Sequence, residues 1–139
     1  MKLSVEWKGK MAFEGSTPSG HFLKMDASQE DGGQNSGARP TEMLLNALAG
    51  CTGIDIISIL DKMRLNVSSF SMEVEGERAS EHPKRFTDIH IHYVLEGELP
   101  EEKVHRAITL SKEKYCSVAH SLSAALTMSY EINGKKIKA

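Results

Sequence analysis

The sequence predicts an α+β protein in which antiparallel sheets pack around one long central helix. Three observations support this class: short alternating segments open the chain, a long apolar helical pattern begins at Pro40, and two long strand patterns followed by shorter helices complete it. Because strand and helix patterns do not alternate regularly, a doubly wound α/β fold is disfavoured. The 139 residues, 40% of them apolar, are enough for one hydrophobic core, so we expect a single domain over residues 1–139.

Apolar and polar residues alternate over residues 3–25, which predicts a meander of three short strands. Leu3, Val5 and Trp7 would share one face of the first strand. The following segment, residues 27–39, is rich in Ser, Gln, Asp, Gly and Asn and has little to bury. We therefore expect a mobile loop between the meander and the central helix.

A long helix is predicted from Pro40, which suits the first helical position because its missing N–H is not needed there. Apolar residues follow at spacings of three and four, namely Met43, Leu44, Ala47, Leu48, Cys51, Ile54, Ile57, Leu60 and Met63. Further apolar residues lie off this stripe, including Leu45 and Ile59. We expect the helix to cross the interior of the protein or a subunit interface.

The second half of the chain begins with two long strand patterns, over residues 67–74 and 87–95. A helix is predicted from Pro100, with acidic residues in its first turn near the positive end of the helix dipole. A second short helical run is expected from Cys116 to Ala125. A final strand over residues 126–132 closes the predicted fold.

Composition excludes some classes of partner. The formal net charge of −2 and the isoelectric point near 6.3 leave no basic excess for binding nucleic acid. The first residues lack the apolar core of a secretion signal, and Asp55, Asp61 and Lys62 interrupt the most apolar stretch. We therefore expect a cytoplasmic protein that does not bind a membrane.

The sequence contains two cysteines, Cys51 and Cys116, 65 positions apart. In a reducing compartment such cysteines are more often reactive or simply buried than joined in a structural bridge. Cys51 lies in the predicted central helix between Gly50 and Gly53, and each glycine costs about 1 kcal/mol in a helix relative to alanine. The glycines either let a ligand or backbone approach the sulfur, or permit close packing around a buried thiol.

Cys116 is placed near the start of a predicted helix, where backbone N–H groups favour the thiolate. A thiolate is the form of cysteine that attacks a peroxide oxygen. The sulfenic acid that results condenses with a second thiol to a disulfide, which protects the first sulfur from irreversible oxidation. Two cysteines are therefore the minimum set for such a cycle.

Two stretches of the sequence resemble the OsmC and organic hydroperoxide resistance superfamily. One runs from Arg39-Pro40 to Gly50-Cys51, and the other is Cys116-Ser-Val-Ala. In that family a proline starts the helix, the peroxidatic cysteine follows eleven residues later, and a resolving cysteine lies in a Cys-Pro/Ser-x-Ser/Ala segment. The amino-acid sequence of both stretches is most similar to that of a less characterised OsmC-like subgroup.

The resemblance implies an OsmC-like fold that forms an intertwined homodimer, with two active sites at the subunit interface. It implies reduction of organic hydroperoxides by Cys51 and resolution by Cys116, in defence against oxidative stress. It also implies that an external reductant, a lipoyl-type or other small dithiol, regenerates the protein. No bound cofactor is expected.

The sequence departs from the better-characterised branches at two positions. Their catalytic glutamate commonly follows the proline, but here Thr41 stands there and Glu42 comes next, a shift of about 100° around a helix. Their thiolate-binding arginine lies in the first strands, but the nearest one here is Arg39. Glu42 is thus the candidate catalytic carboxylate and Arg39 the candidate substrate-binding cation. The simpler roles are a helix-dipole acid for Glu42 and an exposed loop cation for Arg39.

Two of the histidines, together with the two cysteines, are candidate ligands for a metal ion. His120 lies four positions after Cys116 and, with Cys51 and His21, would supply four chemically adequate zinc ligands. These residues are scattered rather than arranged in closely spaced pairs, so the sequence predicts no metal site. His90 and His92 alternate with apolar residues, which places them on a solvated strand face.

Two other functions fit the same residues. Thr41 and the missing amino-terminal arginine favour a non-catalytic dimer that binds a hydrophobic small molecule between its long helices. The cysteine pair alone is also consistent with a redox-sensing protein, in which a Cys51–Cys116 bond changes an interface.

Overall fold

The structure, a computed structural model, describes residues 1–138. Its internal contacts divide the chain into two compact units, residues 1–44 and the part from Leu45 onward. Each unit is described separately below, and the expectation of a single domain stays a prediction.

The first unit opens with the predicted meander. Its three strands form an antiparallel sheet in chain order, with bounds β1 (Ser4–Trp7), β2 (Phe13–Ser16) and β3 (Phe22–Met25). The register aligns Val5 with Gly15 and Leu23, and Trp7 with Phe13 and Met25. Because directly paired residues point to the same side of a sheet, these side chains form one apolar face.

That apolar face is uncovered within the unit. Trp7 is 65% exposed, Val5 57% and Leu23 44%. In the first unit the buried residues are Ala12, Gly15 and Asp26, too few to form a hydrophobic core. The sheet therefore has an apolar surface of the kind that proteins normally bury.

The segment expected to be a mobile loop has an internal organising residue, Asp26. It is 3% exposed, and its carboxylate accepts hydrogen bonds from the amides of Ala27, Gln34 and Ser36 and from the Ser36 hydroxyl. A short 3₁₀ turn, η1 (Gln29–Asp31), lies inside this loop. These bonds, led by the Ser36 hydroxyl, hold the pKa of Asp26 at about 2 although burial opposes them.

The central helix, α1 (Pro40–Lys62), begins at the predicted proline. Its buried side consists of Leu48, Ala49, Thr52, Gly53, Ile56 and Leu60. The side turned away from this core exposes Ile54, at 73%, and Ile57, at 41%. Length and composition alone would allow α1 to cross a membrane, despite its charged residues. Its buried side packs in the hydrophobic core of the second unit, as in a soluble protein.

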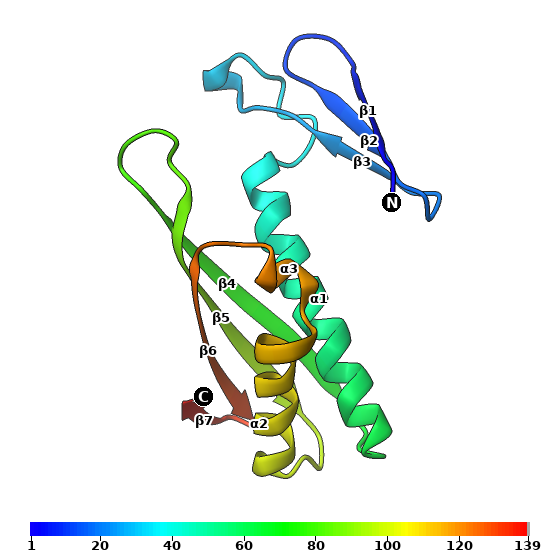
Figure 1. Ribbon diagram of the computed structural model, residues 1–139, viewed down its shortest axis with the longest axis vertical. Coiled ribbons are helices and arrows are strands. Elements are labelled where there is room, and N and C mark those ends of the chain that lie inside the picture. The colour runs from blue at the N-terminus through cyan, green and yellow to red at the C-terminus, as the bar shows by residue number, and fades with distance from the viewer. Residues whose placement is uncertain (139) are drawn as a thin grey trace. The chain divides into compact units, whose positions relative to one another are not determined.

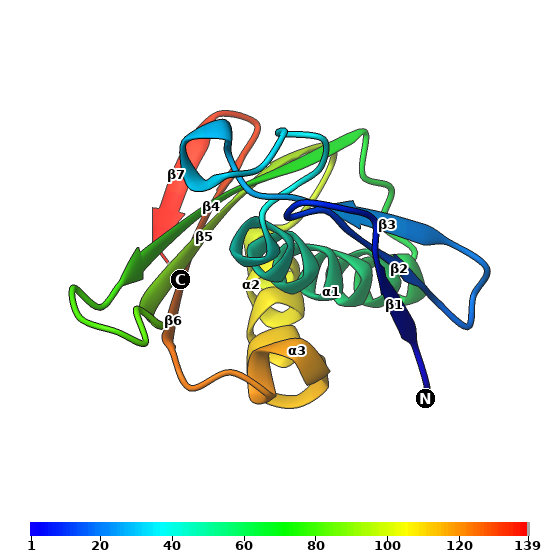
Figure 2. The same cartoon turned by 90° about the horizontal axis from the view of Figure 1, so that it is seen from above.

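The second unit contains a four-stranded sheet in the order β4-β5-β6-β7. The strands are β4 (Ser69–Arg78), β5 (Phe86–Glu96), β6 (Ala125–Ile132) and β7 (Lys135–Lys138). Figures 1 and 2 show α1 and α2 (Glu101–Leu110) against the same face of this sheet. The core lies between them, with Leu48, Ile56 and Leu60 from α1, Ile89, Ile91, Tyr93 and Leu95 from β5, Val104, Ala107 and Ile108 from α2, and Met128, Tyr130 and Ile132 from β6.

The expected α+β class with antiparallel sheets around a long helix is confirmed, with one difference in this sheet: β5 and β6 run parallel. Parallel neighbours require a long crossover, and residues 97–124 supply it by carrying α2 back over the sheet. The β4–β5 and β6–β7 pairs are antiparallel. The sheet is therefore mixed.

The helical run expected from Cys116 to Ala125 is also shorter than predicted. The structure has a single turn, α3 (Ser117–His120), and the chain is already in β6 at Ala125. The edge strand β7 was not predicted. It follows a turn at Asn133-Gly134, where both residues have positive φ, and its lysines are of the type that protects exposed sheet edges.

Candidate active site

The fold brings Cys51 and Cys116 together. Both are free cysteines, Cys51 half-buried on α1 and Cys116 fully buried. Their sulfur atoms and a carboxylate oxygen of Asp55 all lie within 4.8 Å of one another. Residues separated by 65 positions thus form one compact cluster of two thiols and a carboxylate.

A turn of π-helix positions Cys116. After α2, residues 111–115 form this wider turn, which closes with a hydrogen bond of 2.8 Å from the Cys116 amide to the Ser111 carbonyl. Cys116 then caps α3, and its sulfur accepts a hydrogen bond of 3.3 Å from the Ala119 amide. This confirms the prediction that Cys116 stands at the start of a helix.

The two glycines beside Cys51 have different surroundings. A Cβ added at Gly53 would lie 3.0 Å from the Met72 side-chain methyl, so Gly53 permits close packing of α1 against β4. A Cβ at Gly50 would meet nothing within 4 Å. The packing interpretation therefore holds for Gly53, whereas approach of a ligand beside Gly50 stays a prediction.

Asp55 is a site residue that sequence reasoning missed. It lies one helical turn after Cys51, and its Oδ2 accepts a hydrogen bond of 2.9 Å from the hydroxyl of the buried Ser111. In the sequence it was interpreted only as a charge interrupting an apolar stretch. The i,i+4 spacing of Cys51 and Asp55, which places both on one helix face, is the signal that could have found it.

The surroundings of Cys116 disfavour its thiolate. Burial is the largest cause, and a hydrogen bond with Cys51 and the negative charges of Cys51 and Asp55 add to it, which raises the pKa of Cys116 to about 11. The Ala119 amide acts in the opposite direction. At neutral pH Cys116 is therefore a protonated thiol, and its proton is available for donation.

The two sulfurs are therefore suited to different chemical roles. Cys51 is the more accessible thiol, on the helix side next to the open space at Gly50. Cys116 is enclosed and protonated, so it is less suited to the first attack on a substrate. The arrangement favours Cys51 as the attacking sulfur and Cys116 as the thiol that closes a disulfide.

Glu42 and Arg39 lie at the amino-terminal end of α1, within the first unit. The Glu42 carboxylate accepts a hydrogen bond of 2.9 Å from the Arg39 amide, as in the capping box that satisfies a free N–H at a helix start. The Arg39 guanidinium donates to the Asn35 side chain at 2.9 Å and to the Gly37 carbonyl at 3.1 Å. Roles for either residue at the sulfur stay predictions.

Two cavities flank α1 in the second unit. One, of about 560 Å³, is lined mainly by apolar side chains and glycines, including Gly50, Ile54, Ile57, Phe70 and Met72. The other, of about 350 Å³, opens beside Asp55 and is lined by residues that include Ile59, Met63, Leu110 and Tyr115. The cluster thus has an apolar groove nearby and a separate opening at its carboxylate.

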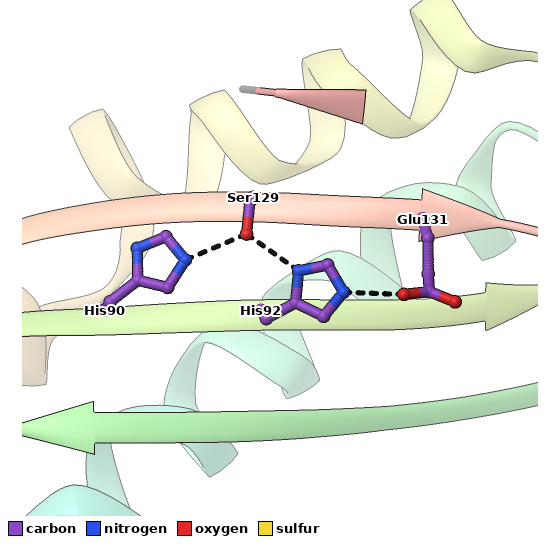
Figure 3. A network of polar contacts seen from close by, with 4 residues as sticks. All are labelled: His90, His92, Ser129 and Glu131. Atoms are coloured by element: carbon purple, nitrogen blue, oxygen red, sulfur yellow. Dashed lines mark hydrogen bonds and ion pairs between the residues drawn. The ribbon is translucent and has the colours of Figure 1, made fainter. Parts of the chain in front are cut away.

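His90 and His92 lie outside this cluster, on the sheet face opposite the core, where Figure 3 shows them joined through Ser129. His90 Nε2 and His92 Nδ1 each contact the Ser129 hydroxyl, at 2.8 and 2.7 Å, and His92 Nε2 contacts Glu131 at 2.7 Å. His90 Nδ1 contacts the Thr127 hydroxyl at 2.7 Å. Both histidines are half-buried rather than freely solvated, and the chain of contacts joins the parallel strands β5 and β6.

Similar proteins share both the sequence and the fold. Residues 33–131 match the family described as OsmC-like protein. Protein YhfA of Escherichia coli K12 is 40% identical over 135 residues, which cover 95% of this chain and 98% of YhfA. A hypothetical protein from Aquifex aeolicus VF5 has a crystal structure that matches with a TM-score of 0.83 and 32% identity, covering 94% of each chain.

A more distant structure has the same fold. A Legionella pneumophila protein, described as an organic hydroperoxide resistance protein OsmC, matches with a TM-score of 0.67 at 15% identity, over 95% of this chain and 96% of that one. The mixed sheet, the long helix and the thiol pair at that helix define a small α+β protein of the OsmC type. This chain belongs to the OsmC-like family.

Proposed function

We propose that this chain is a cytoplasmic thiol peroxidase that reduces organic hydroperoxides through Cys51 and Cys116 in defence against oxidative stress. The observation that carries the proposal is the approach of these two sulfurs to within 4.8 Å in an OsmC-like fold. A disulfide needs the sulfurs at about 2 Å, so a modest local movement would join them.

In the first step the Cys51 thiolate attacks the terminal oxygen of the hydroperoxide. The O–O bond breaks, an alcohol leaves after taking up a proton, and Cys51 becomes a sulfenic acid. The apolar groove beside Gly50 and Ile54 offers a surface for the hydrocarbon part of an organic hydroperoxide.

In the second step the Cys116 sulfur attacks the Cys51 sulfenic acid. The new S–S bond displaces hydroxide, which leaves as water with the Cys116 proton. One hydroperoxide and two thiols thus give one alcohol, one water and one disulfide. A small dithiol, of lipoyl type or similar, then reduces the disulfide by thiol–disulfide exchange, so no bound cofactor is needed.

The active form in this proposal is a homodimer. The exposed Ile54 and Ile57 of α1 and the uncovered apolar face of β1–β3, which includes Trp7, are surfaces that a second copy of the chain would bury. Arg39 and Glu42 would act on substrate or thiolate in this assembled form.

The proposal is tested by peroxide consumption with a dithiol reductant in excess. The wild-type protein should turn over cumene hydroperoxide faster than hydrogen peroxide. Cys51→Ser should abolish turnover, because the attacking sulfur is gone. Cys116→Ser, treated with excess hydroperoxide in the absence of the dithiol, should react once and then accumulate sulfinic acid on Cys51, because no second thiol captures the sulfenic acid.

The comparison of the two variants makes the test specific. A double variant, Cys51→Ser/Cys116→Ser, serves as the baseline for uncatalysed reduction by the dithiol. Turnover retained in Cys51→Ser above that baseline would eliminate the mechanism.

The apolar groove favours a second candidate function, the binding of a hydrophobic small molecule without catalysis. It would explain the largely apolar lining of the 560 Å³ cavity, including Ile54, Phe70 and Met72. Native mass spectrometry of the purified protein separates the two functions. A co-purifying apolar ligand, together with peroxide oxidation no faster than that of free cysteine, would support this alternative.

A further inference from the structure

The cluster of Cys51, Asp55 and Cys116 combines three potential metal ligands at one point. Their ligand atoms lie within 4.8 Å of one another. Tetrahedral zinc, with bonds of about 2.0 to 2.3 Å, holds neighbouring ligand atoms roughly 3.5 to 4 Å apart. Separations of up to 4.8 Å would therefore have to contract by roughly 1 Å to give zinc geometry.

Two of the three ligands are already oriented by neighbouring groups. The Ser111 hydroxyl donates to Asp55 Oδ2 at 2.9 Å, and the Ala119 amide donates to the Cys116 sulfur at 3.3 Å. Hydrogen bonds to ligand atoms from outside the coordination sphere are the usual means of fixing metal ligands. The ligands also come from two separate segments, α1 and the chain around α3, so a metal ion would join these segments.

The charges at the cluster also favour a cation. With both thiols ionised beside the Asp55 carboxylate, three negative groups would lie within 4.8 Å of one another and repel. A divalent cation between these groups would offset the repulsion, because its positive charge stabilises all three negative groups at once.

We propose that the reduced chain binds one Zn²⁺ ion through the Cys51 and Cys116 thiolates and the Asp55 carboxylate. Binding releases two protons, one from each thiol, and involves no electron transfer. Thiolate sulfur with carboxylate oxygen is a ligand set that zinc accepts. A cavity of about 350 Å³ borders Asp55, one of the three proposed ligands, and offers room for water beside it.

This inference shares the two cysteines with the proposed peroxidase but does not depend on peroxide turnover. Zinc-bound thiolates would be withdrawn from reaction with hydroperoxides. The site would therefore hold the reduced protein in a protected form, and formation of a disulfide would release the ion.

The direct test is binding of metal to the reduced, metal-free full chain under anaerobic conditions. Zn²⁺ is titrated by calorimetry at several pH values. Co²⁺ is used as a spectroscopic probe, because thiolate-to-cobalt charge transfer and tetrahedral d–d bands report sulfur ligation directly. We expect one ion per chain, release of two protons per ion, and a tetrahedral spectrum with two thiolates.

Variants distinguish zinc binding at this site from nonspecific zinc binding to thiols or surface histidines. Asp55→Asn should weaken zinc affinity by more than about tenfold, and Ser111→Ala, which removes only the orienting hydroxyl, by about tenfold. Asp88→Asn, at an exposed position of β5, should have no effect. His92→Gln controls for the histidine-bearing sheet face and should also leave affinity unchanged.

The proposal is overturned if the ion binds with less than one equivalent, if Asp55→Asn binds as tightly as wild type, or if His92→Gln removes binding. Failure of the peroxidase proposal leaves these readouts unchanged, because binding is measured without peroxide. Conversely, a chain that reduces hydroperoxides but binds no zinc would retain the proposed function and lose this inference.

Discussion

At the scale of single residues, the two cysteines differ in how deeply they are buried. Cys116 is enclosed in the core, capped by the Ala119 amide and faced by Asp55. Cys51 lies half-buried on the open side of the same cluster. This difference in environment is the basis of the proposed order of reaction, with Cys51 first and Cys116 second.

Removing the Asp55 charge should lower the pKa of Cys116. Burial and the contacts with Cys51 and Asp55 raise that pKa to about 11, so the thiolate becomes abundant only at high pH. In a Cys51→Ser background, Cys116 is the remaining cysteine and its ionisation can be followed by NMR of ¹³C-labelled cysteine. Adding Asp55→Asn should shift the titration to lower pH, because a like charge is lost. Adding Asp88→Asn instead should leave it in place, and equal titrations in all three proteins would contradict the assigned charge effect.

The raised pKa also makes the stability of the reduced protein depend on pH. The unfolded chain ionises Cys116 near 9, whereas the folded chain does so near 11. The stabilising contribution is therefore complete below pH 9 and is lost as pH rises from about 9 to about 11. Urea unfolding of the reduced protein across this range should show a steeper loss of stability for the wild type than for Cys116→Ser. An equal dependence of the unfolding free energy on pH in the two proteins would contradict the prediction.

The contacts of His90 and His92 fix the positions of their ring protons. Glu131 accepts from His92, so His92 Nε2 carries a proton, and in the neutral ring Nδ1 then accepts from the Ser129 hydroxyl. Ser129 then accepts from His90 Nε2, which leaves His90 Nδ1 to accept from the Thr127 hydroxyl. We expect both neutral rings to be Nε2–H tautomers, as measured by ¹⁵N NMR of the imidazoles. Ser129→Ala removes the acceptor of the His90 Nε2 proton, so His90 should no longer be held in one tautomer. An Nδ1–H tautomer for His92 in the wild type would contradict the assigned hydrogen-bond directions.

At the scale of elements, the loop between β3 and α1 depends on one carboxylate. Four hydrogen bonds converge on Asp26, from Ala27, Gln34 and the amide and hydroxyl of Ser36. They favour the ionised carboxylate and lower its pKa from about 3.8 to about 2. The loop, featureless by composition, is therefore a defined structure at neutral pH.

The lowered pKa of Asp26 predicts where the loop loosens in acid. Its stabilising contribution is complete above pH 4 and is lost as pH falls through about 2. Amide chemical shifts of Gln34 and Ser36 should titrate together in that range, and Asp26→Asn should show loosened amides already at neutral pH. Glu30→Gln, an exposed change in the same loop, is the control. Unchanged protection of the Gln34 and Ser36 amides in Asp26→Asn would contradict this role.

Local patterns predicted most elements but not the direction in which β6 runs. Alternation and helical spacing act over neighbouring residues, and they located the strands of the meander, α1, β4, β5 and β6. The parallel pairing of β5 with β6 depends on where the crossover through α2 returns to the sheet, which is a property of tertiary packing. The early end of α3 at His120 has a similar origin, because the chain must reach β6 by Ala125.

The site was predictable in part. The spacing from Pro40 to Cys51 and the Cys116 segment indicated both sulfurs through their family resemblance. The i,i+4 spacing places Asp55 on the helix face of Cys51, but no feature of the sequence indicated its hydrogen-bond partner, because Ser111 lies 56 positions away on another element. Pairings of this kind appear only when the fold is known.

At the scale of the whole molecule, a single chain leaves large apolar side chains uncovered. Ile54 is 73% exposed on α1, and Trp7 is 65% exposed on β1. Surfaces of this kind are normally buried in an assembly. A second copy of the chain is the partner that we propose.

Ile54→Glu should therefore weaken the dimer. A buried unpaired charge costs about 3 to 5 kcal/mol, which corresponds to a dissociation constant raised by more than about 100-fold. Analytical ultracentrifugation over a range of protein concentrations measures this change. Glu102→Gln, an exposed substitution on α2, is the matched control and should sediment as the wild type does. A monomeric wild-type protein, or a variant that dimerises unchanged, would contradict the proposed interface.

The most direct test of the two-cysteine account is the product of a single reaction cycle. The fully reduced protein is mixed with one equivalent of cumene hydroperoxide per chain without a reductant, and free thiols and peptide masses are determined over time. The account predicts rapid loss of two thiols per hydroperoxide and a Cys51–Cys116 disulfide within one chain. Loss of thiols no faster than in free cysteine, or a sulfinic acid on Cys51 beside an unreacted Cys116, would contradict it.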